Sequence, residues 1–282
     1  MLRRVLFELA IVVLVLLVVA SVVCIGRERA IRTRREARSR LRETAPITAI
    51  LVSILLFNSV ARQIVPDLSW IFGWEATWAI YDIEGKFITW IQSFEHPLLT
   101  DYFSFVYIFG YVFMLVFPVM AYFALSNTRT LRELLTAYTL NYTLGLVCYV
   151  LIIAYGPRNM IPEVATGLLY DAYPRFQHLT GQVNRNTNVF PSLHTSLAAT
   201  VAFFAYRTRE EYPLWYVVAV VLAVSVAIST MYLGIHWAID VVAGAVLAYL
   251  SVYLATVLVG RWSLSDLLDD RFGDRVPFPR RE

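Results

Sequence analysis

Two histidines and one aspartate are the residues whose types and spacing could do chemistry in this chain. His194 ends the run Phe-Pro-Ser-Leu-His, and His236 is followed four positions later by Asp240. Each histidine is expected at the start of an apolar helix. The stretch between them is long enough for one membrane helix down and a second helix back. Both imidazoles would therefore meet at one face of a bilayer, which predicts a reactive site there.

The spacing of His236 and Asp240 favours a nucleophile held by a carboxylate. Residues four apart share one face of a helix, so the carboxylate can accept the Nδ1 proton of the imidazole. This fixes the tautomer and leaves Nε2 free to attack. In steps of four, the same face continues from polar to small residues, as in a close helix contact. That predicted face consists of Tyr232, His236, Asp240, Gly244 and Ala248.

The segment before His194 is typical of an anion-binding helix start. Pro191 is expected at the first turn, with Ser192 and Leu193 beside it. Backbone N–H groups at a helix start have no partner within the helix, and phosphate is a common ligand for them. The sequence therefore predicts that the start of this helix holds a phosphate.

The composition is that of a membrane protein: 59% of residues are hydrophobic and 16% are charged. Apolar runs near the length of about 20 residues needed to cross a bilayer recur along the chain. We expect an all-α, polytopic membrane helix bundle. Its N-terminal anchor helix and Arg-rich cytoplasmic connector occupy residues 1–43, a six-span domain occupies 44–260, and a charged tail occupies 261–282. The predicted spans are 5–25, 46–65, 101–125, 134–155, 189–206, 214–231 and 236–259.

The distribution of arginine predicts the orientation. Residues 26–43 hold eight Arg against three Glu, so the positive-inside rule places them in the cytoplasm. Alternation of the spans then puts the N-terminus and both histidines on the external face of the cell membrane. Three arginines fall on that outer face, where the rule disfavours them, and a bound anion would explain them. They are Arg158, Arg175 and Arg185.

Other classes of protein fit the residues less well. The arginines cluster beside the membrane, which favours lipid contacts over a nucleic-acid partner. A zinc site would require further His or Cys ligands at short spacing, and His96 and His178 form no such pair. We therefore expect neither a metal nor another cofactor. A non-catalytic transporter or scaffold, whose polar residues only hold helices together, remains the alternative.

At these residues the chain resembles the type 2 phosphatidic acid phosphatase superfamily, and within it the branch that contains fungal inositol phosphorylceramide synthase. The family pattern has Pro-Ser-Gly-His in one helix, and Ser-Arg, then His, then Asp in another. Here Leu193 replaces the Gly and Thr230 replaces the Arg. The family's Lys and Arg-Pro motif is not intact, and Arg158 is the candidate that stands in its place.

The resemblance implies a metal-independent lipid phosphatase or phosphotransferase. His236 would attack phosphorus to form a phosphohistidine, Asp240 would orient it, and His194 would protonate the leaving oxygen. Water or an acceptor alcohol would then take the phosphoryl group, and the residues do not decide between them. A haloperoxidase on the same scaffold is disfavoured by the missing cationic residues. The candidates for phosphate binding are Arg158, Ser192, Pro191, Leu193, Arg185 and Tyr232.

Overall fold

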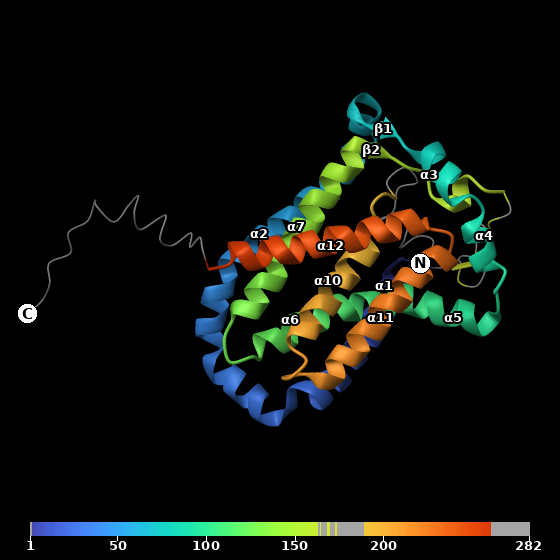
Figure 1. The fold of residues 1–282 in the computed structure, drawn as a ribbon. Coiled ribbons are helices and arrows are strands. Elements are labelled where there is room, and N and C mark those ends of the chain that lie inside the picture. Colours follow the sequence, from blue (N-terminus) through green and yellow to red (C-terminus); the bar gives the residue numbers. More distant parts are fainter. Residues whose placement is uncertain (1, 163, 165–167, 170–172, 174–188, 261–282) are drawn as a thin grey trace, which may run out of the picture.

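The computed structural model describes residues 2–162, 164, 168–169, 173 and 189–260 (Figure 1). Helices make up most of these residues, which confirms the predicted all-α fold. Two short strands, β1 (Trp74–Glu75) and β2 (Ile152–Ile153), pair in parallel. Arg185 and the predicted tail at 261–282 lie outside the described residues.

The first part of the chain is one long, curved helical stretch, which contains the predicted anchor, connector and second span. α1 (Leu2–Ala20) passes through the π-helical turn η1 (Ser21–Ile25) into α2 (Gly26–Phe72). In Figure 1 this blue stretch runs around one end of the bundle and back along its side. The predicted connector at 26–43 is helical, because its Arg, Glu, Ala and Leu residues favour a helix. α2 also continues through Pro46 and Pro66.

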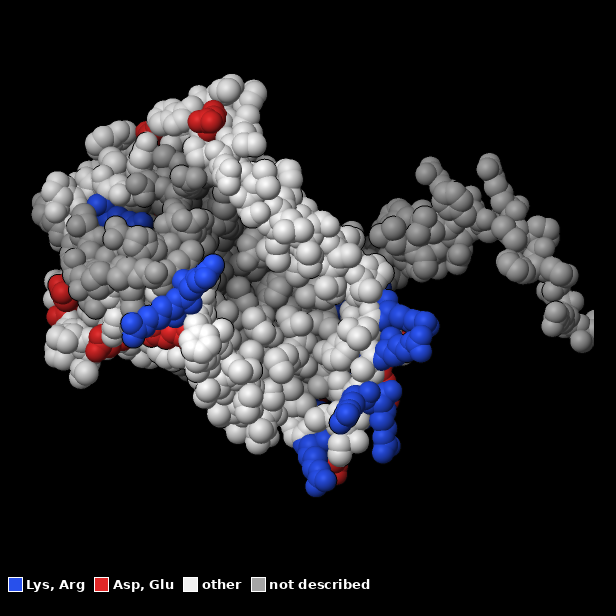
Figure 2. All heavy atoms as spheres, turned by 180° about the vertical axis from the view of Figure 1, so that it is seen from behind, with Lys and Arg blue, Asp and Glu red and all other residues white. Residues whose placement is uncertain are grey.

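The arginine-rich part of α2 forms hydrogen bonds to two loops at one end of the bundle. Arg40 is buried and donates hydrogen bonds to the main-chain carbonyls of Phe123 and Leu125. Arg29 donates to the carbonyl of Glu211 at 3.1 Å. The remaining arginines of this segment are exposed, and Figure 2 shows blue side chains gathered at this end, with others on the opposite side of the molecule. The loops expected on the inner side therefore do meet at one end.

The rest of the bundle consists of one helical stretch with a π-helical turn inside it, one long continuous helix, and three helices in the C-terminal half. α5 (Pro97–Phe105), η2 (Val106–Gly110) and α6 (Tyr111–Phe123) form one stretch, followed by α7 (Arg129–Leu151). α10 (Leu193–Arg207), α11 (Pro213–Tyr232) and α12 (Ala238–Leu258) complete the bundle. Among the residues that the structure describes, five helical stretches are long and apolar enough to cross a membrane: Arg3–Ala61, Pro97–Phe123, Arg129–Leu151, Pro213–Tyr232 and Ala238–Leu258.

α10 differs from the span predicted at 189–206, because it has only 15 residues. At about 1.5 Å per residue it is shorter than a hydrocarbon core of about 30 Å. It packs against α6, α7, α11 and α12, so protein surrounds it. Its polar side chains find partners there: Asn141 of α7 donates to Thr200 at 3.1 Å and accepts a hydrogen bond from Ser196. α10 is thus an interior helix that carries His194 into the bundle.

Two short helices occupy the aromatic-rich region between α2 and α5. They are α3 (Thr77–Glu84) and α4 (Phe87–Gln92). Trp70, Trp78 and Trp90 expose more than half of their surface, in keeping with the preference of amphipathic rings for a membrane interface.

The segments predicted on the outer side meet at the other end of the bundle. Gln92 of α4 donates a hydrogen bond to the main-chain carbonyl of Tyr232 at 3.0 Å. Arg158 lies in the short helical turn η3 (Pro157–Asn159), and its main-chain N–H donates to the main-chain carbonyl of Gly234 at 3.2 Å. Val5 of α1 is buried in the same cluster as Leu233. The N-terminus therefore lies at the end that carries the two histidines.

Candidate active site

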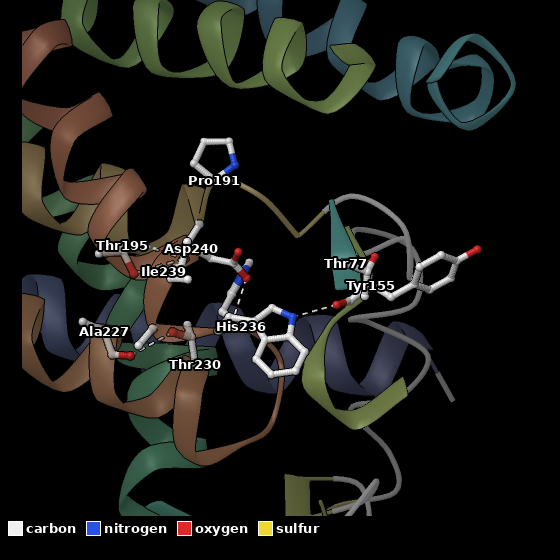
Figure 3. Close-up of polar contacts among 12 residues, drawn as sticks. Thr77, Tyr155, Pro191, Thr195, Ala227, Thr230, His236, Ile239 and Asp240 are labelled. Carbon is white, nitrogen blue, oxygen red and sulfur yellow. Dashed lines mark hydrogen bonds and ion pairs between the residues drawn. The ribbon is translucent and has the colours of Figure 1, made fainter. Parts of the chain in front are cut away.

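His236 and Asp240 contact each other, although they do not share a helix. α11 ends at Tyr232, Gly234 turns the chain with a φ of 69°, and α12 begins only at Ala238. Asp240 lies in the first turn of α12, where its Oδ2 accepts the main-chain N–H of Trp237 at 2.9 Å and lies 3.3 Å from Nδ1 of His236. Figure 3 shows the two side chains pointing toward each other. The predicted continuous face from Tyr232 to Ala248 is wrong, since the loop breaks the helix.

Burial determines the protonation state of His236. The residue is 4% exposed, and this desolvation lowers the pKa of His236 to about 3. The positive charge of Arg158 acts in the same direction, and a hydrogen bond with the backbone of Val189 opposes it. The imidazole is therefore neutral at physiological pH. A nucleophilic His236 requires the tautomer in which Nδ1–H is donated to Asp240 and the lone pair is on Nε2.

His194 lies in the first turn of α10, next to His236. The ring centroids of the two histidines are 6.1 Å apart. Ser192 is the N-cap residue of α10, where its Oγ accepts hydrogen bonds from the N–H and the hydroxyl of Thr195. The helix start predicted from Pro191 and Ser192 is thus present, and it brings the two histidines together.

The two parts of the site are joined through the main chain. The N–H of Ser192 donates to the carbonyl of Asp240 at 3.0 Å. This close approach needs Gly244, since a Cβ there would lie 2.5 Å from the carbonyl oxygen of Ser192. The start of α10 and the first turn of α12 are therefore in direct contact.

Arg158 lies beside the His236 loop, as the phosphate-binding prediction requires. Its main-chain N–H bonds to Gly234, and its Cβ would be 3.5 Å from a Cβ at that glycine. Gly156 fits against the same loop, because a Cβ there would be 2.6 Å from the carbonyl of Ile235. Segment 156–158 is thus packed directly on the loop that presents His236.

Comparison with known families identifies the fold around these residues. A profile described as the PAP2 superfamily matches residues 69–254, which include both histidines, Asp240 and Arg158. The chain belongs to the PAP2 superfamily. This membership supports phosphatase-type phosphoesterase chemistry at the site. It does not single out the inositol phosphorylceramide synthase-like branch.

One curated relative is an uncharacterized protein of the archaeon Methanocaldococcus jannaschii. It is 25% identical over 167 residues, which cover 58% of this chain and 64% of that protein. The similarity therefore spans less than two thirds of the relative. No solved structure matches the chain.

Several of the predicted phosphate ligands have other partners in this PAP2 protein. The hydroxyl of Tyr232 is 2.8 Å from Oγ1 of Thr100, so it points to α5. The side chain of Leu193 packs on α7, where a Cβ at Gly145 would be 2.6 Å from it. Leu193 can offer a phosphate only its main-chain N–H. The carbonyl of Pro191 accepts the hydroxyl of Tyr149 at 3.3 Å.

Two tyrosines that the sequence reasoning missed flank His194. The ring centroids of Tyr107 and Tyr111 lie 4.9 and 4.6 Å from that of His194. Tyr107 belongs to η2, and Tyr111 begins α6. π-helical turns within longer helices are frequent at functional sites, but an apolar run with two tyrosines gives no signal of this in the sequence.

A carboxylate on α3 was also missed. Glu84 accepts hydrogen bonds from the main-chain N–H groups of Ala238 and Ile239, at 2.9 and 3.0 Å. Burial raises the pKa of Glu84, and the nearby Asp240 adds to this increase. Within the described part of the chain, no three His, Cys, Asp or Glu side chains are placed to hold a metal ion.

Proposed function

We propose that this chain is an integral-membrane lipid phosphoesterase that works through a phosphohistidine at His236. The observation that carries the proposal is the contact of 3.3 Å between Nδ1 of His236 and Oδ2 of Asp240, with the ring of His194 next to it. The three groups supply a nucleophile, a residue that orients it, and an acid–base group. Acid–base help of this kind typically contributes about 10²–10⁴-fold to a rate.

In the first step, Nε2 of His236 attacks the phosphorus of the substrate. A P–N bond forms as the bond between phosphorus and the lipid oxygen breaks, and His194 gives its proton to that leaving oxygen. The neutral state of His236 suits this attack, because the ring does not have to lose a proton first. Asp240 stabilises the positive charge that develops on the ring.

In the second step, His194 accepts a proton from water, whose oxygen attacks the phosphohistidine. The P–N bond breaks, inorganic phosphate leaves and His236 is restored. An alcohol in place of water would make the enzyme a phosphotransferase, and the product would be the phosphomonoester of that alcohol. A phosphatidylinositol-type product would require a phospholipid substrate whose headgroup alcohol leaves in the first step, so that the phosphatidyl group stays on His236.

Arg158 and the start of α10 would hold the phosphate oxygens. Arg158 is packed on the His236 loop, and its guanidinium can form two parallel hydrogen bonds to a phosphate. The N–H of Leu193 lies at the first position of α10, where the helix itself provides no acceptor. Arg185, a further candidate, lies outside the described residues and stays a prediction.

An apolar cavity beside the site supports a substrate with a hydrocarbon chain. Its volume is about 560 Å³, and Phe190, Ile239 and Val242 are among its lining residues. Phe190 precedes Pro191 and Ile239 precedes Asp240 in the chain, so the cavity is lined by the two segments that carry the site, and Glu84 of α3 also lines it. Val242 exposes 64% of its surface on α12, one of the helices suited to span the membrane. We infer that the chain of a lipid phosphate enters here.

The orientation follows from the arginines and stays part of the proposal. The exposed Arg side chains of α2 lie at the end of the bundle opposite the histidines. With these arginines in the cytoplasm, the site would open on the external face of the cell membrane.

The decisive experiment is turnover of lipid phosphates by the purified protein in phospholipid vesicles. Phosphatidic acid labelled with ³²P is offered alone, or with inositol or glycerol as the acceptor. Release of labelled inorganic phosphate identifies a phosphatase, and a labelled phosphomonoester of inositol or glycerol identifies a transferase. If neither appears, with this lipid or with p-nitrophenyl phosphate, the enzyme assignment fails and a transporter or scaffold becomes the better reading.

A further inference from the structure

Glu84 joins α3 to the first turn of α12 across a long separation in the sequence. One carboxylate oxygen accepts the N–H of Ala238 at 2.9 Å, and the other accepts the N–H of Ile239 at 3.0 Å. These are first-turn donors that the helix itself cannot satisfy. A negative group is also favourable at this end of a helix. Both carboxylate oxygens of Glu84 are therefore committed to α12.

Two further contacts hold the residue that precedes these donors. The ring of Tyr81, also on α3, meets that of Trp237 edge-to-face at a centroid distance of 6.2 Å. Nε1 of Trp237 donates to the carbonyl of Tyr155 at 2.8 Å. The N–H of Tyr155 in turn donates to Oγ1 of Thr77, the first residue of α3. α3 thus contacts residues 237–239 directly through Tyr81 and Glu84, and indirectly through Thr77, which binds Tyr155.

Residues 237–239, which α3 holds in this way, separate His236 from Asp240 in the chain. Asp240 uses its Oδ2 for the N–H of Trp237 and for the imidazole of His236. Because Glu84 satisfies the next two N–H groups, Asp240 does not have to turn toward them. The carboxylate of Asp240 can then stay directed at the ring.

We propose that Glu84 is a positioning residue, which fixes the first turn of α12 so that Asp240 holds His236 in its reactive orientation. The inference rests on the proposed function of the His236–Asp240 pair. Glu84 touches neither histidine, so its effect reaches the reaction through the main chain of Ala238 and Ile239. A displacement of about 1 Å at a reacting group can cost about 10²-fold in rate.

The test compares Glu84→Ala and Glu84→Gln with Asp82→Ala. Asp82 is exposed on the same helix, so its replacement removes a carboxylate from α3 without releasing α12. Turnover of p-nitrophenyl phosphate in detergent gives kcat and KM. Hydrogen exchange of the backbone amides at 238 and 239 reports the contact without reference to activity.

We expect faster exchange and a kcat about 10²-fold lower in Glu84→Ala, with KM within about twofold of the wild-type value. Glu84→Gln should fall between, because the amide keeps one acceptor oxygen and turns its NH₂ group, a donor, toward the second N–H. Asp82→Ala should match the wild type in all three measurements.

A role confined to helix stability would give faster exchange and an unchanged kcat, and this result would overturn the inference. Unchanged exchange in Glu84→Ala would overturn it too. If the wild type and Asp82→Ala both lack turnover, the proposed function fails, whereas the exchange rates still decide whether Glu84 holds α12.

Discussion

The main-chain N–H of Ser192 donates to the main-chain carbonyl of Asp240 at 3.0 Å. This hydrogen bond joins the N-cap residue of α10 to the first turn of α12, so the helix starts that carry the site are fixed relative to each other. His194 and His236 lie on either side of the junction with their ring centroids 6.1 Å apart. The geometry of the reactive groups therefore depends on how closely two backbones approach.

Gly244 makes that approach possible, and its replacement should separate the two helices. A Cβ at this position would be 2.5 Å from the carbonyl oxygen of Ser192, which cannot move like a flexible side chain. We expect Gly244→Ala to lose about 1–3 kcal/mol of stability, as overpacking does, together with most of the activity. Thermal unfolding and turnover in detergent measure the two effects. The exposed neighbour Ala245 provides the control, and an Ala245→Val variant as impaired as Gly244→Ala would contradict the argument.

His236→Asn should abolish turnover and leave the fold intact. The side chain is the proposed nucleophile, and losing such a group typically lowers kcat by at least about 10³-fold. Phosphate release and size-exclusion behaviour are measured side by side. His96→Asn serves as the control, because His96 caps α5 and asparagine also caps a helix well. Substantial turnover by His236→Asn would remove the nucleophile assignment.

Arg158→Ala should weaken transition-state binding by about 2 kcal/mol, or about 30-fold in kcat/KM, which is typical of a charged hydrogen bond. Arg158→Lys should recover only part of this loss, since an ammonium lacks the planar fork that binds two phosphate oxygens. Vanadate, a mimic of the phosphorus centre, should inhibit Arg158→Ala less than the wild type. Arg42 is exposed on α2 at the other end of the bundle and supplies the control. Equal vanadate sensitivity in Arg158→Ala and the wild type would place Arg158 outside the site.

Filling the apolar cavity should distinguish lipid from soluble substrates. Val242→Trp places a large ring at the wall of the cavity, whereas Val246→Trp adds the same ring to an exposed position one turn further along α12. We expect kcat/KM for a long-chain lipid phosphate to fall about 10-fold in Val242→Trp only, the equivalent of losing contact with about two methylenes. Turnover of p-nitrophenyl phosphate should not change. A parallel loss with both substrates would mean that the cavity does not hold the lipid chain.

Accessibility of single cysteines should establish which face carries the site. In a background of Cys24→Ala and Cys148→Ala, cysteine is placed at Asn159 or at Glu210, both of which are exposed. Asn159→Cys should react with a membrane-impermeant maleimide in intact cells, and Glu210→Cys should react only after lysis. The opposite pattern would turn the site toward the cytoplasm.

The sequence by itself determined the helical membrane fold and singled out the candidate residues that the structure brings together. Long apolar runs have few alternatives to a helix in a bilayer, because every backbone polar group must be satisfied internally. The grouping of loops at two ends also follows from the number of apolar runs. His194, His236, Asp240 and Arg158 could be chosen because ionisable residues are expensive in this setting and need a reason to be there.

Only the tertiary structure decided how these residues meet. The spacing of His236 and Asp240 predicts one helix face, yet a turn at Gly234 separates α11 from α12 and the pair meets across a helix start instead. Nothing local shows that Tyr232 points to Thr100, or that Leu193 packs on α7. Glu84 belongs to a segment far from α12 in the sequence, and Tyr107 and Tyr111 lie in an unremarkable apolar run. These contacts arise from the packing of separate helices, and the pattern of one segment carries no information about which segment packs against it.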